Sequence, residues 1–160
     1  MKNNISSRRG FFKTLVPKKE FILRPPYADE VSSFLKHCIT CLDKPCVNAC
    51  EESIIQIKDD LPYISFENSG CTYCKECALS CQKDVLHVET PHQINALFSI
   101  DTQKCLSWNG VVCFSCKDYC DERAIEFFGM FKPLVKDACI SCGFCVAPCP
   151  NDAIKIKESF

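Results

Sequence analysis

The sequence has few of the residues from which a large hydrophobic core is built. It contains one tryptophan and five glycines among 160 residues, and its 47% hydrophobic content includes 16 cysteines. Without those cysteines the apolar share falls below the range usual for globular domains. No stretch approaches the roughly 18 uninterrupted apolar residues that a membrane-spanning helix requires. We therefore expect neither a large conventional core nor a transmembrane segment.

The chain also lacks an overall excess of positive charge. Its 19 basic and 20 acidic residues give a formal net charge of -1, which excludes a generally basic nucleic-acid-binding protein. The charges are unevenly distributed, because the first 19 residues contain six basic and no acidic side chains, so that the remainder carries -7. The sequence predicts a basic, largely extended N-terminal tail, residues 1–28, ahead of an acidic body.

Motifs for nucleotide binding and for hydrolysis are absent as well. The sequence has no Gly-rich phosphate loop, no G-x-G-x-x-G and no Ser/His/Asp set. His37, His87 and His92 lack the paired spacing of a Rieske-type site, and we interpret them as surface or packing residues. No lone cysteine is paired with a histidine, as a catalytic thiol would require. We expect a protein without a substrate site of its own.

Cysteine is what the chain has in abundance, and it falls into four groups of four. The first cysteines of successive groups are 33, 34 and 34 residues apart, which indicates one unit repeated four times. The groups are Cys38, Cys41, Cys46 and Cys50; Cys71, Cys74, Cys77 and Cys81; Cys105, Cys113, Cys116 and Cys120; and Cys139, Cys142, Cys145 and Cys149.

The spacing within the groups is typical of iron–sulfur proteins. In CTYCKEC, residues 71–77, and CISCGFC, residues 139–145, three thiolates three residues apart let a tight loop wrap one face of a [4Fe–4S] cubane. In two-cluster ferredoxins the fourth cysteine of such a run ligates the other cluster. We predict that all sixteen cysteines are metal ligands and that they hold four [4Fe–4S] clusters.

Other uses of the cysteines fit the pattern less well. Eight disulfides are disfavoured by the regular spacing and by the lack of a cleavable secretory signal. Zinc ribbons usually present two separated C-x2-C pairs rather than three closely spaced cysteines and a fourth. The iron–sulfur interpretation is therefore preferred to both.

Two pairings of the groups are open, adjacent (first with second, third with fourth) and nested (first with fourth, second with third). The gaps from Cys50 to Cys71 and from Cys120 to Cys139 are shorter than that from Cys81 to Cys105, which favours adjacent pairing. The four ligand sets would then be Cys38, Cys41, Cys46 and Cys81; Cys71, Cys74, Cys77 and Cys50; Cys105, Cys113, Cys116 and Cys149; and Cys139, Cys142, Cys145 and Cys120.

This reasoning predicts an α+β fold. Behind the tail we expect two tandem bacterial-type ferredoxin-like domains, each with two [4Fe–4S] clusters, at residues 29–92 and 93–160. Short apolar segments follow each cysteine group, and turn residues separate the first three from a second apolar segment. We expect small helices and three hairpins, formed by 54–58 with 63–66, 85–89 with 97–100, and 124–128 with 133–135.

The third group departs most from regular spacing, with seven residues between Cys105 and Cys113. A longer loop still returns a ligand, but it loosens the site, so we expect the Cys105 cluster to be the most labile. Tyr73, Phe114, Tyr119 and Phe144 lie in or beside the cysteine loops. We interpret them as packing that screens clusters from water rather than as electron conduits.

The tail contains Ser-Arg-Arg-Gly-Phe-Phe-Lys at residues 7–13, which has the order of a twin-arginine export motif. Residues 14–20 supply only two apolar residues before proline and charge, against the roughly 7 to 15 of a signal peptide. We therefore expect a cytoplasmic protein. Arg8 and Arg9 are candidates for docking on a partner, the alternative being a solvated basic arm.

The SSRRGFF segment, Arg24-Pro25-Pro26 and the four cysteine groups together resemble the NapF ferredoxin-type proteins of the periplasmic nitrate reductase system. That resemblance implies a cytoplasmic protein with four [4Fe–4S] clusters that associates with the molybdenum-containing catalytic subunit before export and aids its maturation. The second hypothesis is a general polyferredoxin electron carrier, or a wiring subunit of a membrane-associated oxidoreductase, in which the tail has no role. The sequence does not identify the redox donor.

Overall fold

Short helices and strands follow one another along the chain in the computed structural model, which describes residues 21–28, 30–90 and 94–159. The helical segments are α1 (Val31–Ser33), the π-helical turn η2 (Phe34–Cys38), α2 (Pro45–Asn48), α3 (Glu76–Leu79), the 3-10 turn η3 (Ser107–Asn109) and α4 (Ser115–Asp118). The strands are β1 (Ile55–Lys58), β2 (Leu61–Ile64), β3 (Ala96–Ile100), β4 (Ile125–Phe128), β5 (Phe131–Val135) and β6 (Ile154–Glu158). The fold is the predicted small mixture of helix and strand.

Two of the three predicted hairpins are present. Strand β1 pairs with β2 across Asp59 and Asp60, whose φ angles of 50° and 62° suit the tight two-residue turn that matches strand twist. Strand β4 pairs with β5 around Gly129, whose φ of 65° is accessible to glycine without strain. Both hairpins therefore follow from local turn chemistry.

The prediction of a hairpin between residues 85–89 and 97–100 is wrong. Strand β3 instead pairs antiparallel with β6, from Ala96 opposite Glu158 to Ile100 opposite Ile154. Leu86 forms a single antiparallel bridge with Ala28. The chain bends at Pro26 and Tyr27, and the backbone N–H of His87 donates to the Tyr27 carbonyl at 2.8 Å. Both segments of the predicted hairpin therefore pair with segments far away in the sequence rather than with each other.

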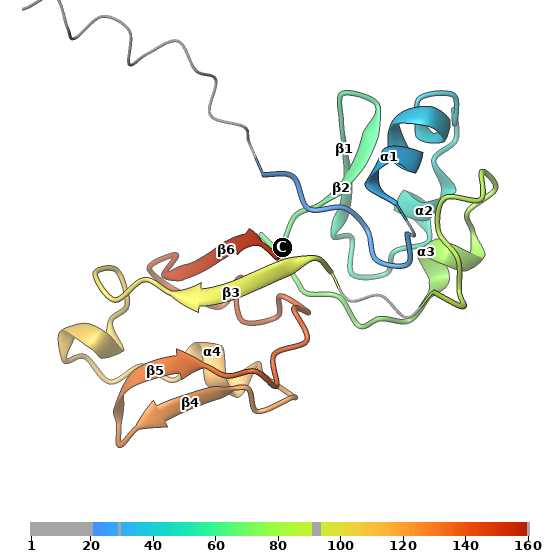
Figure 1. Cartoon of the computed structure of the whole chain (residues 1–160). Coiled ribbons are helices and arrows are strands. Elements are labelled where there is room, and N and C mark those ends of the chain that lie inside the picture. Colours follow the sequence, from blue (N-terminus) through green and yellow to red (C-terminus); the bar gives the residue numbers. More distant parts are fainter. Residues whose placement is uncertain (1–20, 29, 91–93, 160) are drawn as a thin grey trace, which may run out of the picture.

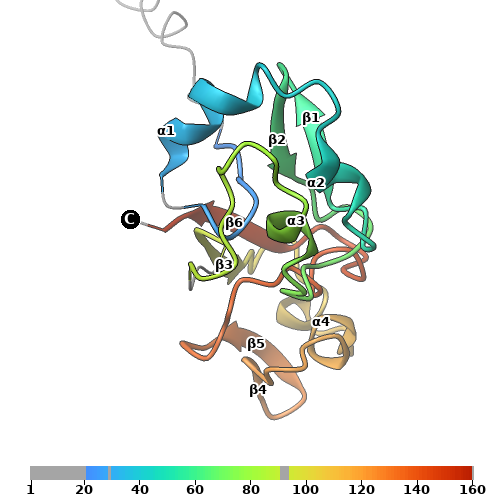
Figure 2. The same ribbon diagram turned by 90° about the vertical axis from the view of Figure 1, so that its right-hand side faces the viewer.

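The strand pairings divide the described chain into a first half, residues 21–90 without residue 29, and a second half, residues 94–159. In each half an early extended segment pairs with the last one, as Ala28 does with Leu86 and β3 does with β6. Figures 1 and 2 both show the β3–β6 pair between α1, α2, α3 and the β1–β2 hairpin on one side and α4 with the β4–β5 hairpin on the other.

One backbone conformation recurs at the same place after every cysteine group. Ser53, Asp84, Arg123 and Asp152 each stand three residues after the last cysteine of a group, with φ of 54°, 52°, 52° and 45°. Left-handed φ is uncommon outside glycine, so four such residues at the same offset indicate that the four units share one type of turn. The turn leads the chain out of each cysteine loop.

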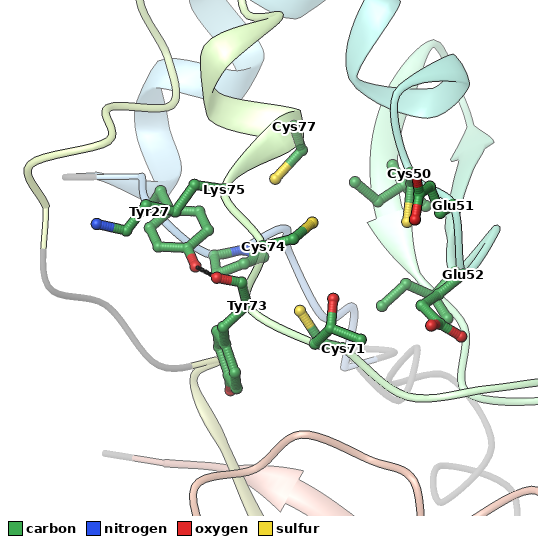
Figure 3. A pocket seen from close by; sticks show the side chains of 13 residues that line it. Tyr27, Cys50, Glu51, Glu52, Cys71, Tyr73, Cys74, Lys75 and Cys77 are labelled. Atoms are coloured by element: carbon green, nitrogen blue, oxygen red, sulfur yellow. Dashed lines mark hydrogen bonds between the residues drawn. The ribbon is translucent and has the colours of Figure 1, made fainter.

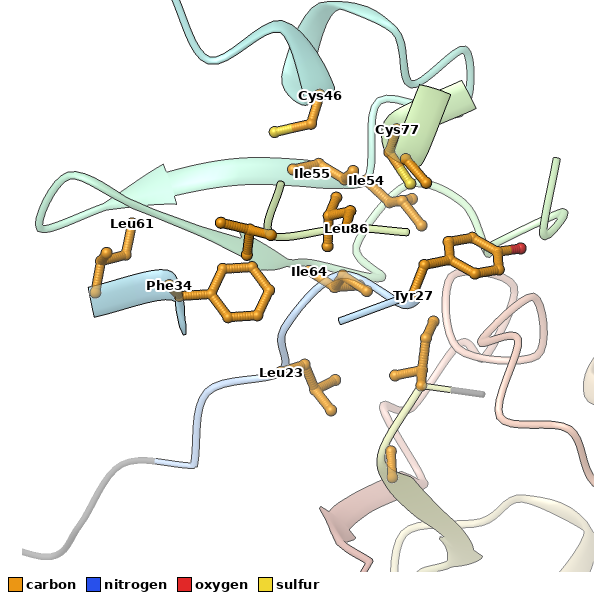
Figure 4. Close-up of a cluster of buried hydrophobic side chains, with 14 of the residues drawn as sticks. Leu23, Tyr27, Phe34, Cys46, Ile54, Ile55, Leu61, Ile64, Cys77 and Leu86 are labelled. Atoms are coloured by element: carbon orange, nitrogen blue, oxygen red, sulfur yellow. The ribbon is translucent and has the colours of Figure 1, made fainter. Parts of the chain in front are cut away.

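One cluster of buried side chains, mostly from the first half but including Ile94, Ala96 and Phe98, forms most of the core (Figure 4). Phe34 is 1% exposed, Ile54 2% and Val85 2%. Cys46 and Cys77 belong to the same cluster, so the core borders the cysteine loops directly.

Among the described residues no helix combines the length and the apolar character needed to span a membrane.

Candidate metal centres

All sixteen cysteines are free thiols, and three sets of four each line a cavity. The three cavities are similar in size. The sets are Cys50, Cys71, Cys74 and Cys77, seen in Figure 3; Cys120, Cys139, Cys142 and Cys145; and Cys105, Cys113, Cys116 and Cys149.

The remaining four cysteines are neighbours of one another. Burial raises the pKa of the Cys38 thiol, and the nearby thiols Cys81 and Cys41 raise it further. Burial likewise raises the pKa of Cys46 to about 11, with Cys81, Cys38 and Cys41 adding to the effect. These electrostatic interactions place Cys38, Cys41, Cys46 and Cys81 together.

Each set therefore combines three cysteines of one group with the last cysteine of its neighbour in the sequence. Cys50 lies with Cys71 and its group, and Cys120 lies with Cys139 and its group. These are the sets that adjacent pairing requires. The helices help to build them, because α2 begins beside Cys46 of one set and ends shortly before Cys50 of another.

The loops of the second and fourth groups share a backbone conformation. Tyr73 and Ser141, each two residues after the first cysteine, have φ of 55° and 61°, and Lys75 and Gly143 two residues later have φ of 69° and 86°. Such turns direct successive amides inward. The backbone amide of Tyr73 accordingly lowers the pKa of Cys71, although burial outweighs it and raises that pKa to about 11.

Backbone amides also reach the last cysteines of the third and fourth groups. The N–H of Ala124 donates to Cys120 Sγ at 3.3 Å, and the N–H of Ala153 donates to Cys149 Sγ at 3.2 Å. Hydrogen bonds of this kind stabilise negative charge on sulfur and shift cluster potentials. The two bonds lie at the same offset, in line with the shared turn described above.

The irregular first group is shaped by a π-turn and a lysine. In η2, Phe34 and Cys38 both face inward, 1% and 9% exposed. Lys44 donates from Nζ to the carbonyl of Cys41 at 2.8 Å and to that of Cys38 at 3.3 Å. Lys44 thus ties the longer loop together. Sequence reasoning missed this residue, and the available signal was its place among the four residues between Cys41 and Cys46, where a regular run has two.

The long loop of the third group is also held by side chains. The Asn109 amide donates to the Cys105 carbonyl at 2.8 Å and to the Thr102 and Gln103 carbonyls at 3.1 and 3.2 Å. Trp108 Nε1 donates to the Pro133 carbonyl at 3.0 Å. The lability expected for the Cys105 site stays a prediction. These hydrogen bonds would restrain the loop and so slow the loss of the cluster.

Burial makes these thiols poor acids. It raises the pKa of Cys77 and of Cys145 to about 12 and that of Cys116 to about 11, and the neighbouring thiols of each set raise these values further. Four thiolates around one cavity repel one another unless a cation lies between them. The sets are therefore suited to a strongly charged metal core.

The donor geometry distinguishes a cluster from a single ion. Zinc brings all its ligands within about 2.3 Å of one centre. In the described part of the chain no three His, Cys, Asp or Glu side chains gather closely enough to hold one ion. A cubane spreads four thiolates over four separate irons. Sets of four thiols around a cavity fit that group, and none of the sixteen cysteines is paired in a disulfide in the structure.

The other predicted residues are placed as follows. Phe114 packs on Phe127 with ring centroids 4.8 Å apart, as expected of a packing residue. Tyr73 packs against the core cluster, as expected, and its hydroxyl also donates to the Ile140 carbonyl in the other half, at 2.6 Å. Arg8 and Arg9 lie outside the described residues.

Comparisons with known proteins agree with this chemistry. A family model described as a 4Fe-4S binding domain matches residues 133–155, which contain the fourth cysteine group. The chain is 34% identical over 155 residues to the ferredoxin-type protein NapF of Escherichia coli K12, covering 93% of each chain. It is also 34% identical over 167 residues to the ferredoxin-type protein NapF of Haemophilus influenzae, covering 94% of this chain and 90% of the relative.

Proposed function

The chain belongs to the NapF family of ferredoxin-type proteins, and on this premise we propose that its sixteen cysteines hold four [4Fe–4S] clusters for electron transfer. The observation that carries the proposal is the gathering of the cysteines into four sets of four, three of them around cavities of similar size. Each cluster, when bound, supplies the exchange of one electron.

The chain's own residues would form the environment of each cluster. The thiolates hold the irons, and the amides of Ala124 and Ala153 stabilise negative charge on the sulfurs of Cys120 and Cys149. Apolar side chains such as Ile54 and Ile55 line one cavity beside the cysteines and keep water away. Cys74 is the exposed member of its set, so that this site meets solvent at Cys74.

We place this carrier in the cytoplasm, as an accessory protein that docks on the catalytic subunit of periplasmic nitrate reductase before its export. There it supplies the electrons or the cluster needed for maturation of the subunit's iron–sulfur centre. Family membership and the twin-arginine-like motif without a following apolar stretch support this role. Arg8 and Arg9, in a tail of six positive charges, are the proposed docking residues.

The test is capture of the catalytic subunit by the tagged full-length chain from anaerobic, nitrate-respiring cells. We expect the precursor subunit to be retained. Replacing Arg8→Gln and Arg9→Gln should reduce retention while leaving iron content unchanged, because the first cysteine is Cys38. Retention should weaken as salt rises, since such steering is screened within about 8 Å at physiological ionic strength.

The variant Lys18→Gln with Lys19→Gln is the matched control, because it removes the same charge from the same tail. A smaller loss in this control assigns docking to the arginine motif, and an equal loss assigns it to tail charge alone. Full retention by both variants would favour the simple electron carrier and remove the docking role. Recovery of the protein mainly from the periplasm would contradict the proposed location.

A further inference from the structure

The two halves meet at the loops of the second and fourth cysteine groups. The backbone N–H of Cys71 donates to the carbonyl of Cys142 at 2.6 Å. Cys71 and Cys142 line different cavities, so this bond links two candidate cluster sites in different halves. The path runs from one sulfur through the Cys71 backbone, across one hydrogen bond, and out through the Cys142 backbone to the other sulfur.

Tyr73 fixes the approach of these two loops. Its hydroxyl donates to the Ile140 carbonyl at 2.6 Å and accepts from the Ile94 N–H at 3.2 Å, both in the second half. Its own carbonyl accepts a hydrogen bond from the Tyr27 hydroxyl at 2.8 Å, drawn as a dashed line in Figure 3. A left-handed φ, here 55°, is unfavourable for a tyrosine, and these hydrogen bonds hold Tyr73 in that conformation.

Two glycines allow the halves to approach so closely. A Cβ at Gly143 would lie against the ring carbons of Phe66, well inside van der Waals contact. A Cβ at Gly70 would overlap the backbone nitrogen and ring of Phe144, and backbone cannot swing aside. Phe66 in turn packs on Phe98 of β3 with ring centroids 5.8 Å apart. Any larger side chain at either glycine would therefore separate the two loops.

Within each half the candidate sites are already joined by short helices. Cys46 and Cys50, of two different sets, lie in and just after α2, and Cys77 and Cys81 stand in the same relation to α3. In the second half α4 contains Cys116 and is followed by Cys120, again of two sets. The Cys71–Cys142 contact is thus the step needed to connect all four.

We propose that the Cys71–Cys142 contact is the electron path between the halves, so that the four clusters form one relay ending at the Cys38 and Cys105 sites. Tyr73, Gly70 and Gly143 are its positioning residues. The inference rests on the proposed function. A transfer across the contact moves one electron, so that one core is oxidised and its neighbour reduced by one unit, with no bond or proton changed. A one-electron reductant such as dithionite supplies the electron.

The test isolates the two clusters on either side of the contact. Replacing Cys41→Ala and Cys113→Ala removes a ligand from each outer site and should leave about 8 iron per chain, one cluster in each half. Electron paramagnetic resonance of this reduced protein should show two interacting spins. Adding Gly143→Ala should abolish the interaction while the iron content stays the same.

Gly110→Ala is the matched control. Gly110 has nearly the same φ, 82° against 86°, but a Cβ there meets no atom within 4 Å. The control carries the same backbone strain and should keep the interaction. The same comparison can be made in the chain with all sixteen cysteines, where no cluster ligand has been removed. There Gly143→Ala should lose the spin interaction between the two halves, Gly110→Ala should keep it, and Tyr73→Phe should weaken it.

The outcomes distinguish a failure of the electron path from a failure of cluster binding. Iron-loaded protein whose two spins do not interact, or equal spectra from Gly143→Ala and Gly110→Ala, would overturn the electron path but not the clusters. A full-length chain that binds no iron would remove the proposed function, and this inference with it. Loss of the interaction in Gly143→Ala alone supports both.

Discussion

Replacing Cys50→Ala should remove the cluster of another cysteine group. Cys50 is the last cysteine of the first group, yet it lines the cavity of Cys71, Cys74 and Cys77. Loss of one ligand should release one cubane of four, so that the iron content falls from about 16 to about 12 per chain. The Cys38 site, whose four thiols do not include Cys50, should keep its iron.

Anaerobic alkylation followed by mass spectrometry identifies which site is lost, because cysteines that ligate iron are protected. In Cys50→Ala the label should appear first on Cys74, which is exposed. Cys77 should react slowly, since the thiolate is the nucleophile and burial raises the pKa of this thiol to about 12. The parent protein should remain unlabelled at these positions.

Cys46→Ala is the matched control, since Cys46 belongs to the same group but lies with Cys38 and Cys81. It should expose Cys41 and Cys81 to the label and spare Cys74. Label on Cys38, Cys41 and Cys46 in Cys50→Ala would show that each group holds its own cluster. Label on the Cys139 group instead would establish nested pairing, and either result would refute the ligand sets derived above.

Further changes probe the core, the long loop and the metal. Phe34→Ala should cost about 3–5 kcal/mol, on the order of 10 °C of melting temperature under anaerobic conditions, whereas Val31→Ala, 62% exposed, should have little effect. Asn109→Ala removes hydrogen bonds worth about 1 kcal/mol each and should speed chelator-induced iron loss from the Cys105 site, as mapped by alkylation. Removing iron with a chelator should abolish most of the circular dichroism, because helices this short are unstable without the clusters that join them.

Features that depend on local chemistry could be predicted from the sequence. The β1–β2 and β4–β5 hairpins follow from apolar segments around Asp59-Asp60 and Gly129, where the turn residues tolerate left-handed φ. The grouping of the cysteines follows in the same way from their spacing. These two patterns act over a few residues and therefore need no distant partner.

Features that depend on distant partners could not be predicted. The LFSI segment, residues 97–100, alternates as a strand should, but its pairing with β6 rather than with residues 85–89 is decided by packing across more than fifty residues. Tyr73 packs as interpreted, but no local pattern indicated that its hydroxyl donates to the Ile140 carbonyl in the other half. Gly143 gave no local signal, because its role comes from the ring of Phe66.

The most direct test of the account is the metal content of the full-length chain, purified without oxygen. The four sets of thiols predict about 16 iron and about 16 acid-labile sulfide per chain, with the reduced protein giving the paramagnetic spectrum of [4Fe–4S] clusters. About four zinc and no sulfide would contradict it, as would iron at about 8 per chain in a sample whose cysteines are all protected from alkylation.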